Sequence, residues 1–339
     1  MEQHFEQELA SRIKVDFMGD VDYYLGICFN WRRESDGHVS VHMSQEGYAN
    51  AFIDEMGLQN AVTSPKMMPY HSGLPIDSLP KQPNVSKTDN ETLRSKFRSF
   101  MGMLNWLSIS MRPDLTTVHS LVASATESPT RAHLEALRHV GRYVKATPDY
   151  GISFSSWSHA ALESFVEFPI DDNKDKPHPL AFADSNWGPQ DASIPSDSNA
   201  RYIDLGETRS VCGHLVFLSN GPLIWKSHKE KRNSRSSCEA EIKATDECVK
   251  SVQWLRNVLN DLQLLQDGPT PIYNDNMAAV NWSNTTSQKG MRWVNIRENS
   301  IREAIHEYHE ITVQHIGGKV NPADLFMKEH KSDDCFHAL

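Results

Sequence analysis

The first 90 residues change from a strand-like to a helix-like pattern of apolar and polar positions. Residues 12–43 alternate with the period of β-strands around a Ser-Asp-Gly turn, which predicts a β-hairpin. Residues 44–58 then show the spacing of a short amphipathic helix. Positions 60–90 are rich in Pro, Ser, Asn and Asp, which is typical of an extended connector. We therefore expect a hairpin, a helix and a connector in this order.

Helical periodicity prevails over the next 60 residues. Three helices are predicted, over about 91–110, 112–126 and 129–147. Ser128 has the position of an N-cap for the third helix, because a proline occupies the next position, where its missing N–H is harmless. A strand is expected at 151–156.

A loose, charged segment at 157–178, interpreted as a linker, separates this region from a different pattern. Residues 179–332 read as β-β-β-α-β-α-α-β-α, which is typical of an α/β domain with a mixed sheet. The predicted elements are a strand ending at Asp184, a hairpin with an Asn220-Gly221 turn, a helix over 237–265, a strand ending at Asp275, helices over 276–282 and 294–308, a strand over 310–317, and a helix beginning at Asn321.

Two glutamates near the start of the long helix fall on opposite faces. At about 100° per residue, the apolar stripe is centred almost on Glu241, whereas Glu239 lies roughly 160° away. Glu239 follows Ser236 by three residues, the spacing of a capping box in which the glutamate reaches back to the Ser236 N–H. Glu241 points at the core, where an unpaired carboxylate is costly or protonates. It is therefore held by a cation, or it lies at the rim of the core and reaches water.

Three aspartates accompany Glu241 at the ends of elements. Asp184 and Asp275 end predicted strands, and Asp324 lies in the first turn of the last helix. Each alone is explained more simply as a turn former or a helix N-terminal charge. Four converging carboxylates repel one another unless divalent cations intervene, and oxygen ligands favour Mg²⁺ or Mn²⁺. Two such ions, about 3.5–4 Å apart, clamp the attacking and leaving oxygens of a phosphodiester.

Composition narrows the class of protein. The 339 residues suffice for two to three domains, and 39% hydrophobic with 23% charged residues exclude global disorder. No apolar run approaches the roughly 20 residues of a membrane helix, so no membrane partner is expected. The five scattered cysteines include no CxxC pair, which indicates reduced thiols and a cytoplasmic or nuclear location.

A formal net charge of −10 argues against nucleic-acid binding over the whole surface, but two local stretches are basic. One runs from Lys226 to Arg235 and is either a solvated loop or a phosphate contact. The other is the positive face of the helix over 129–147. The candidate phosphate contacts are Lys226, Lys229, Lys231, Arg232, Arg235, Arg138, Arg142 and Lys145.

A series of motifs carries a family resemblance. In order, they are YYLGICF, HMSQEGYANAFIDEMGL, LRSKFRSFMGMLNWLSISMRPDL, HLEALRHVGRYVKATPDYG, ADSNW, RSVCGHLVFLSNGPLIWKSHKEKRNSRSSCEAEIKA, YNDNMAAV and IREAIHEYHEITVQHIGGKVNPADLFMK. In this order they resemble the C-terminal part of the Pol polyprotein of copia-type long-terminal-repeat retrotransposons. The resemblance implies a ribonuclease H-like mixed sheet with flanking helices, preceded by a smaller α+β remnant of the reverse-transcriptase palm and thumb. The implied domains are a late-palm hairpin and helix (1–65), a thumb- and connection-like helical region (66–156), a linker (157–178), the ribonuclease H-like domain (179–332) and a tail (333–339).

The same resemblance implies an activity. In that family four acids bind two Mg²⁺ ions and hydrolyse the RNA strand of an RNA–DNA hybrid. The family motifs match Asp184, Glu241, Asp275 and Asp324. His315, on the loop before the last helix, stands where some ribonucleases H keep a proton-shuttling histidine. The implied partners are an RNA–DNA hybrid and the missing reverse-transcriptase portion.

Some family features are absent or changed. The Tyr-x-Asp-Asp hairpin of the polymerase is missing, so no polymerase activity is expected. Asn186 replaces the second aspartate of ADSNW, and SQKGMRWVNIREN replaces a usual Lys-His-Ile stretch that contacts substrate. A hybrid ribonuclease is therefore the leading interpretation. A non-catalytic nucleic-acid-binding remnant and an inert relic remain the alternatives.

Overall fold

The structure is a computed structural model. It describes residues 10–16, 19–33, 35, 37–64, 69, 87–155, 178–187, 209–218, 220–285 and 299–327. Four segments named above lie wholly or mostly outside these residues. They are the predicted tail, the predicted linker, the connector and the SQKGMRWVNIREN stretch.

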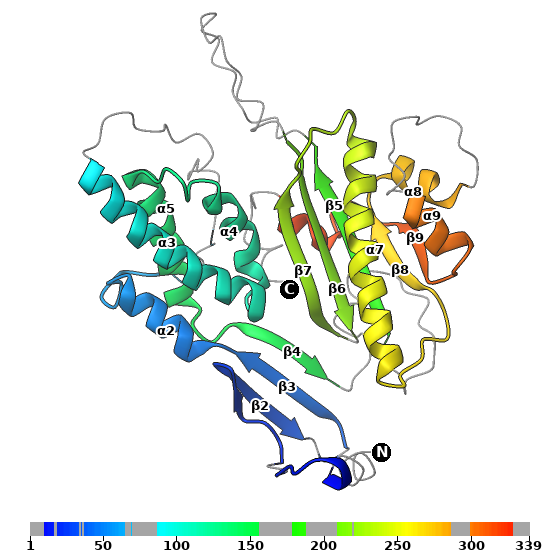
Figure 1. Cartoon of the computed structure of the whole chain (residues 1–339), viewed down its shortest axis with the longest axis horizontal. Helices are drawn as coiled ribbons and strands as arrows, with labels where there is room; N and C mark the ends of the chain where they lie inside the picture. Colours follow the sequence, from blue (N-terminus) through cyan, green and yellow to red (C-terminus); the bar gives the residue numbers. More distant parts are fainter. Residues whose placement is uncertain are drawn as a thin grey trace, which may run out of the picture.

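The N-terminal part contains a four-stranded antiparallel sheet (Figure 1). Its strands pair in the order β1 (Tyr23–Tyr24), β2 (Ile27–Arg33), β3 (Val39–Ser44) and β4 (Gly151–Ser155). The predicted hairpin is confirmed as β2 and β3, in which Phe29 lies opposite Met43. Met43 also lies opposite Ile152 of β4, so two strands far apart in the sequence enclose all the intervening helices.

The helices between β3 and β4 pack around one apolar core. They are α2 (Glu46–Glu55), α3 (Lys87–Ser110), the 3-10 turn η1 (Pro113–Leu115), α4 (Thr116–Ala123) and α5 (Arg131–Ala146). The predicted second helix is thus divided into η1 and α4. The predicted cap Ser128 is wrong, because Thr130 caps α5: its hydroxyl accepts from the His133 N–H, and the His133 ring accepts from the Thr130 N–H.

The C-terminal part is built on a five-stranded mixed sheet, as predicted. Its strands are β5 (Pro179–Asn186), β6 (Val211–Leu218), β7 (Gly221–Lys229), β8 (Thr270–Asn274) and β9 (Ile311–His315). They lie in the order β7-β6-β5-β8-β9, with β5 antiparallel to β6 and parallel to β8. The flanking elements are α7 (Ser237–Asp261), α8 (Met277–Asn284), α9 (Asn299–His306) and the 3-10 helix η2 (Pro322–Phe326). This confirms the predicted fold class, a mixed α/β sheet with flanking helices.

Both faces of this sheet are covered, and β5 contributes to both. Ala181 and Ala183 belong to the core beneath α7, whereas Leu180 and Phe182 belong to the core beneath η2. This alternation has the period of two that a strand imposes. In Figure 1, α7 lies in front of the sheet and η2, in red, lies behind it. Asp184 continues the series of the η2 face.

Several element boundaries differ from the prediction. Strand β5 does not end at Asp184 but pairs with β6 as far as Asn186. The strands β6 and β7 pair at Leu218 and Gly221, so Gly221 belongs to the ladder and not to the turn. Helix α7 ends at Asp261, shortly before Gln263 takes a left-handed φ of 62°. The last element is a 3-10 helix of five residues, which Asn321 caps, and not the α-helix expected there.

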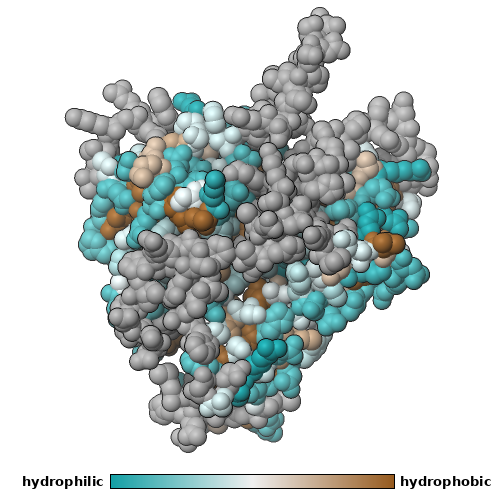
Figure 2. Space-filling model, turned by 180° about the vertical axis from the view of Figure 1, so that it is seen from behind, coloured by the Kyte–Doolittle hydropathy of each residue, from teal (hydrophilic) through white to brown (hydrophobic). Residues whose placement is uncertain are grey.

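Hydrogen bonds join the two parts of the molecule. The Asn220 side chain donates to the Ser155 hydroxyl at 2.6 Å and accepts from the Ser155 N–H at 2.9 Å. The Trp225 indole donates to the Ser108 carbonyl at 2.7 Å. No helix among the described residues is long and apolar enough to cross a membrane. Figure 2 shows that the described surface on the side away from α7 is mainly hydrophilic, with small, separate apolar patches. The predicted domain boundaries stay a prediction.

Candidate metal centre

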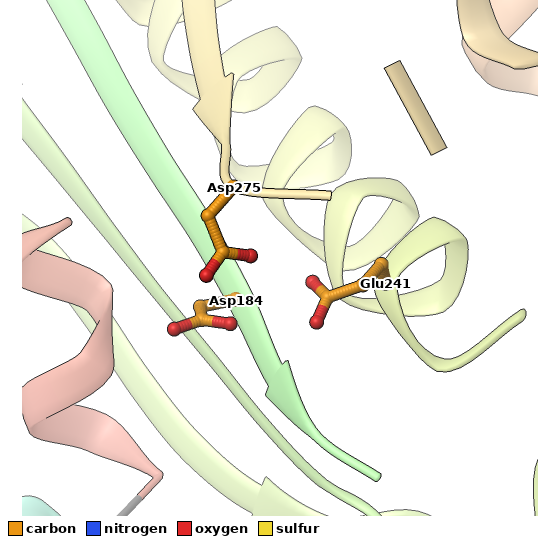
Figure 3. Close-up of side chains that lie close together, drawn as sticks. All are labelled: Asp184, Glu241 and Asp275. Atoms are coloured by element: carbon orange, nitrogen blue, oxygen red, sulfur yellow. The ribbon is translucent and has the colours of Figure 1, made fainter. Parts of the chain in front are cut away.

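Three of the predicted acids meet at one edge of the mixed sheet. Asp184 of β5, Glu241 of α7 and Asp275, directly after β8, each contribute a carboxylate oxygen, and these oxygens lie within 4.8 Å of one another (Figure 3). Asp184 is 2% exposed and Glu241 is 5% exposed, which confirms the burial that the helical geometry predicted for Glu241. The three elements thus bring together carboxylates that are far apart in the sequence.

Strand pairing and a helix cap explain why these side chains converge. Phe182 of β5 lies opposite Tyr273 of the parallel strand β8. Asp184 lies two residues after Phe182, and Asp275 lies two residues after Tyr273, so the two aspartates are at the same level of the sheet. The first turn of α7 is fixed by Ser236, whose hydroxyl accepts from the N–H three residues later. Because parallel strands end at the same edge of a sheet, this edge collects the acids.

The electrostatics of Glu241 favour a cation at this place. Burial, and to a smaller extent the charge of Asp275, raise the pKa of Glu241 to about 7. The Asn274 amide opposes this shift by donating to the Glu241 carboxylate at 3.0 Å. A divalent cation would offset the burial and repulsion that keep Glu241 partly protonated at neutral pH.

Asn274 is a polar residue of the site that the sequence reasoning missed. It is buried, and its amide group also lies 3.3 Å from the Thr245 hydroxyl and 3.4 Å from the Ala183 carbonyl. These contacts connect the end of β8 with β5 and α7. The available signal was an asparagine at the last position of a buried strand, where an amide needs partners.

Asp324 lies on η2 and is not a member of the group within 4.8 Å. The segment is nevertheless anchored beside the other acids, because the Asn321 amide donates to the Ala183 carbonyl at 3.2 Å. Gly213, the cross-strand partner of Asp184, faces η2 so closely that a Cβ there would lie 2.6 Å from Phe326. Figure 3 shows the η2 ribbon, in faint red, on the Asp184 side of the group.

His315 is the last residue of β9, so it lies within the strand predicted over 310–317 and not on the loop before the last helix. Strand β9 pairs with β8 through to the pair Asn274 and His315, which keeps His315 in the sheet. Its side chain is exposed, and its Nε2 lies 3.1 Å from the Asp275 carbonyl oxygen. His315 is therefore next to the acid group through the backbone of Asp275.

Glu239 has the structural role that we predicted, with one difference. Ser236 caps α7, but the Glu239 carboxylate accepts from the Arg235 N–H at 2.8 Å and not from the Ser236 N–H. It also pairs with Lys243, one helical turn further, at 3.0 Å. Glu239 thus stabilises the start of α7 from the face opposite Glu241.

The predicted phosphate contacts differ in their surroundings. Lys226 pairs with Glu247 at 2.8 Å, and Lys145 donates to the carbonyls of Gln59 and Ala61. Arg138 lies 4.0 Å from Glu135. Lys229 and Arg142 are half-buried, whereas Lys231, Arg232 and Arg235 are exposed between β7 and α7.

The exposed basic segment is tied to the sheet by Glu230, which the sequence reasoning also missed. Glu230 is buried and accepts from the Ser234 hydroxyl at 2.9 Å and from Lys243 at 3.2 Å. The Trp187 indole, just after β5, donates to the Ser234 carbonyl at 2.9 Å. These bonds hold the three exposed cations near the strand that carries Asp184.

Known proteins are similar to this chain over most of its length. The retrovirus-related Pol polyprotein from transposon RE2 of Arabidopsis thaliana is 27% identical over 285 residues, which cover 82% of this chain and 16% of that protein. The corresponding polyprotein from transposon RE1 of the same plant is 25% identical over 94% of this chain and 19% of its own length. The chain thus spans less than a fifth of the length of these relatives. No protein-family model matches it.

Among solved structures, LC11-RNase H1, isolated from compost by a metagenomic approach, is 13% identical, with a TM-score of 0.31. The match covers 44% of this chain and 92% of that one. This TM-score is too low to support the fold, which rests on the strand order described above. The sequence matches give the relationship: the chain is related to part of the copia-type, retrovirus-related Pol polyproteins of transposons.

Proposed function

We propose that the protein is a retroelement-derived ribonuclease that hydrolyses the RNA strand of an RNA–DNA hybrid. The observation that carries this proposal is the convergence of Asp184, Glu241 and Asp275 within 4.8 Å at one edge of the mixed sheet. The relationship to transposon Pol polyproteins agrees with it. No polymerase activity is proposed.

The donor set suits hard divalent cations. All three convergent groups are carboxylates, and the raised pKa of Glu241 reflects an environment that disfavours its charge without a cation. We assign Asp184, Glu241 and Asp275 as ligands of two Mg²⁺ ions, or of Mn²⁺, with Asp324 as the fourth ligand from η2. When bound, such ions activate a water molecule and stabilise the departing oxygen of a phosphodiester.

The residues of this chain would orient the ligands and hold the substrate. Asn274 fixes the Glu241 carboxylate, and the Ser185 N–H fixes one oxygen of Asp184 at 2.8 Å. We assign proton transfer to His315, whose Nε2 lies 3.1 Å from the Asp275 carbonyl oxygen.

Phosphate binding is assigned to the two basic surfaces. Lys231, Arg232 and Arg235 are exposed on the segment that Glu230 anchors, and these would contact the hybrid backbone together with Lys226 and Lys229. The helix α5 adds Arg138, Arg142 and Lys145. Binding through such contacts weakens steeply as salt concentration rises. The four cysteines among the described residues are free, which agrees with a cytoplasmic or nuclear location.

A non-catalytic nucleic-acid-binding protein is the second candidate. The position of Asp324 outside the close group favours it, because a centre with three ligands on one side holds two cations less firmly than one with four. The same basic surfaces would then bind the hybrid without turnover.

A cleavage assay separates the two candidates. The parent protein and Asp275→Asn are incubated with a hybrid labelled on its RNA strand, with Mg²⁺ or with EDTA. Asp261→Asn is the matched control, because it removes the same charge at the far, exposed end of α7. We expect the parent and the control to cleave the RNA strand with Mg²⁺ only, and Asp275→Asn to be at least about 100-fold slower. Equal rates for the parent and Asp275→Asn would refute the ribonuclease, and binding by the parent without cleavage would support the second candidate.

A further inference from the structure

A hydrogen bond from the helical part of the molecule ends on the segment that carries Asp324. The hydroxyl of Thr117, in α4, donates to the carbonyl oxygen of Leu325, in η2, at 2.7 Å. Thr117 is 8% exposed, so water competes little for this bond. Leu325 directly follows Asp324. Helix α4 therefore contacts η2 beside the fourth predicted ligand.

The segment η2 needs such contacts because it is too short to hold itself in place. A 3-10 helix of five residues has few internal hydrogen bonds, and their geometry is poor. Its described anchors come from three neighbours. Asn321 is bonded to the Ala183 carbonyl of β5, Phe326 packs on Gly213 of β6, and the Leu325 carbonyl accepts from Thr117. Two of these anchors belong to the sheet, and the third belongs to the helical part.

Helix α4 is itself held against the sheet. The last turn of α3, just before η1 and α4, is fixed by the Trp225 indole of β7, which donates to the Ser108 carbonyl at 2.7 Å. Trp225 and Leu325 both pack against the small apolar core on the η2 face of the sheet. Figure 1 shows α4 next to β7. The bond from Thr117 therefore joins η2 to a helical part that is itself bonded to the sheet.

The η2 face is also the face to which Asp184 belongs by strand alternation. Leu180 and Phe182 lie in the core on that face, and Asp184 is the next residue of the same series. Its cross-strand partner Gly213 faces η2 without space for a side chain. A support that sets the position of η2 thus sets the distance between Asp324 and Asp184.

We propose that the helical part completes the metal centre, with Thr117 as a positioning residue that holds η2 and thereby places Asp324 beside Asp184. The inference rests on the proposed function, because it takes Asp324 as a metal ligand. It adds that the two parts act as one unit: full metal affinity of the mixed-sheet part requires contact with α4.

Three variants of the full chain test this role. Thr117→Val keeps the shape of the side chain and removes the hydroxyl, whereas Thr117→Ser keeps the hydroxyl. Thr116→Val is the matched control. Thr116 is also 8% exposed, but its hydroxyl lies 3.2 Å from the Ser108 carbonyl, so its bond stays within the helical part.

Two measurements are made on each variant. Amide hydrogen exchange of the peptide over 321–327, without metal, reports whether η2 is held. The rise of the melting temperature with Mg²⁺ concentration reports metal affinity without relying on activity. For Thr117→Val we expect faster exchange of this peptide and about three- to tenfold weaker Mg²⁺ binding, the effect of one lost hydrogen bond. Thr117→Ser and Thr116→Val should behave like the parent.

The outcomes separate this inference from the proposed function. A Thr117→Val protein with the exchange or the Mg²⁺ affinity of the parent would overturn the positioning role alone. Equal loss in Thr116→Val would also overturn it, because general loosening of α4 would then explain the result. A parent that does not respond to Mg²⁺ would overturn the inference and the proposed function together.

Discussion

The three convergent carboxylates repel one another when no cation is bound, and Asp275→Asn is expected to relieve this repulsion. Two unit charges 4.8 Å apart repel by about 3.5 kcal/mol at an effective dielectric constant of about 20, and by about 0.9 kcal/mol in water. Asp275 is only partly buried, and its carboxylate lies near the exposed edge of the sheet. The gain from removing its charge is therefore closer to the lower figure, about 1–2 kcal/mol of unfolding free energy.

The size of this gain depends on pH through Glu241. The pKa of Glu241 is raised from 4.5 to about 7 in the folded state. Between these two pH values Glu241 is ionised in the unfolded chain but protonated in the folded protein, so the unfolding free energy falls as pH rises through this range. Below pH 7 Glu241 is largely protonated, and Asp275 repels it little. The stabilisation by Asp275→Asn should therefore be larger at pH 8 than at pH 6. Burial is the first cause of the raised pKa, and the substitution leaves that part unchanged.

Urea unfolding at pH 8, with EDTA or with increasing Mg²⁺, measures both effects. In EDTA, Asp275→Asn should be more stable than the parent. Saturating Mg²⁺ should stabilise the parent by about 2.7 kcal/mol at 100 times its Kd and the variant by much less, so that their order reverses. The control Asp261→Asn, exposed at the end of α7, should change stability by a few tenths of a kcal/mol and keep the parental Mg²⁺ response. A variant less stable than the parent in EDTA, with an unchanged Mg²⁺ response, would refute the reasoning.

Two further predictions concern other buried charges. Burial lowers the pKa of His214 from 6.5 to about 3, so His214 should contribute a loss of about 1.4 kcal/mol of unfolding free energy per pH unit below pH 6.5, as the unfolded chain takes up the proton. Glu241 contributes with the opposite sign in the parent and in His214→Gln alike, so the test is the difference between these two proteins, which should shift against the parent by about 1.4 kcal/mol per pH unit; a difference that stays constant with pH would contradict the assignment. Arg112, 1% exposed, is bonded to Asp114 and Thr147, so Arg112→Met should lower the unfolding free energy by about 3–5 kcal/mol. The exposed pair of Arg33 provides the comparison, because Arg33→Met should cost at most about 1 kcal/mol; equal losses would mean that the burial of Arg112 does not matter.

Local periodicity predicted much of the fold, because it encodes which side of an element is buried. The apolar stripe of α7 placed Glu241 on the core side, and Glu241 is buried there. The positions of Asp184 and Asp275 near the ends of two strands also followed from the pattern, and the parallel pairing of those strands brings their carboxylates together. These features depend on neighbours within a few residues or on one strand ladder.

Features that depend on distant partners were not predictable in this way. An arginine such as Arg112 normally indicates surface, and its burial depends on Thr147, 35 residues further along. The pattern predicted a strand through His315, but it does not reveal that this strand pairs with β8, which places His315 beside Asp275. The amide of Asn274 joins β8 to β5 and α7 through partners that lie 29 to 91 residues earlier in the sequence. A pattern shows that a face is buried, but it does not show what covers that face.

The same distinction separates the four acids of the proposed centre. Asp184, Glu241 and Asp275 are carried by two strands and a long helix of one sheet, so the backbone ladder and the core beneath α7 hold them together. Asp324 is carried by a single 3-10 turn, and one of its anchors, Thr117, lies 208 residues before the residue that it contacts. Changes in the helical part should therefore leave the first three acids in place and affect the fourth. The helical part would then act on the metal centre of the neighbouring sheet through η2 alone.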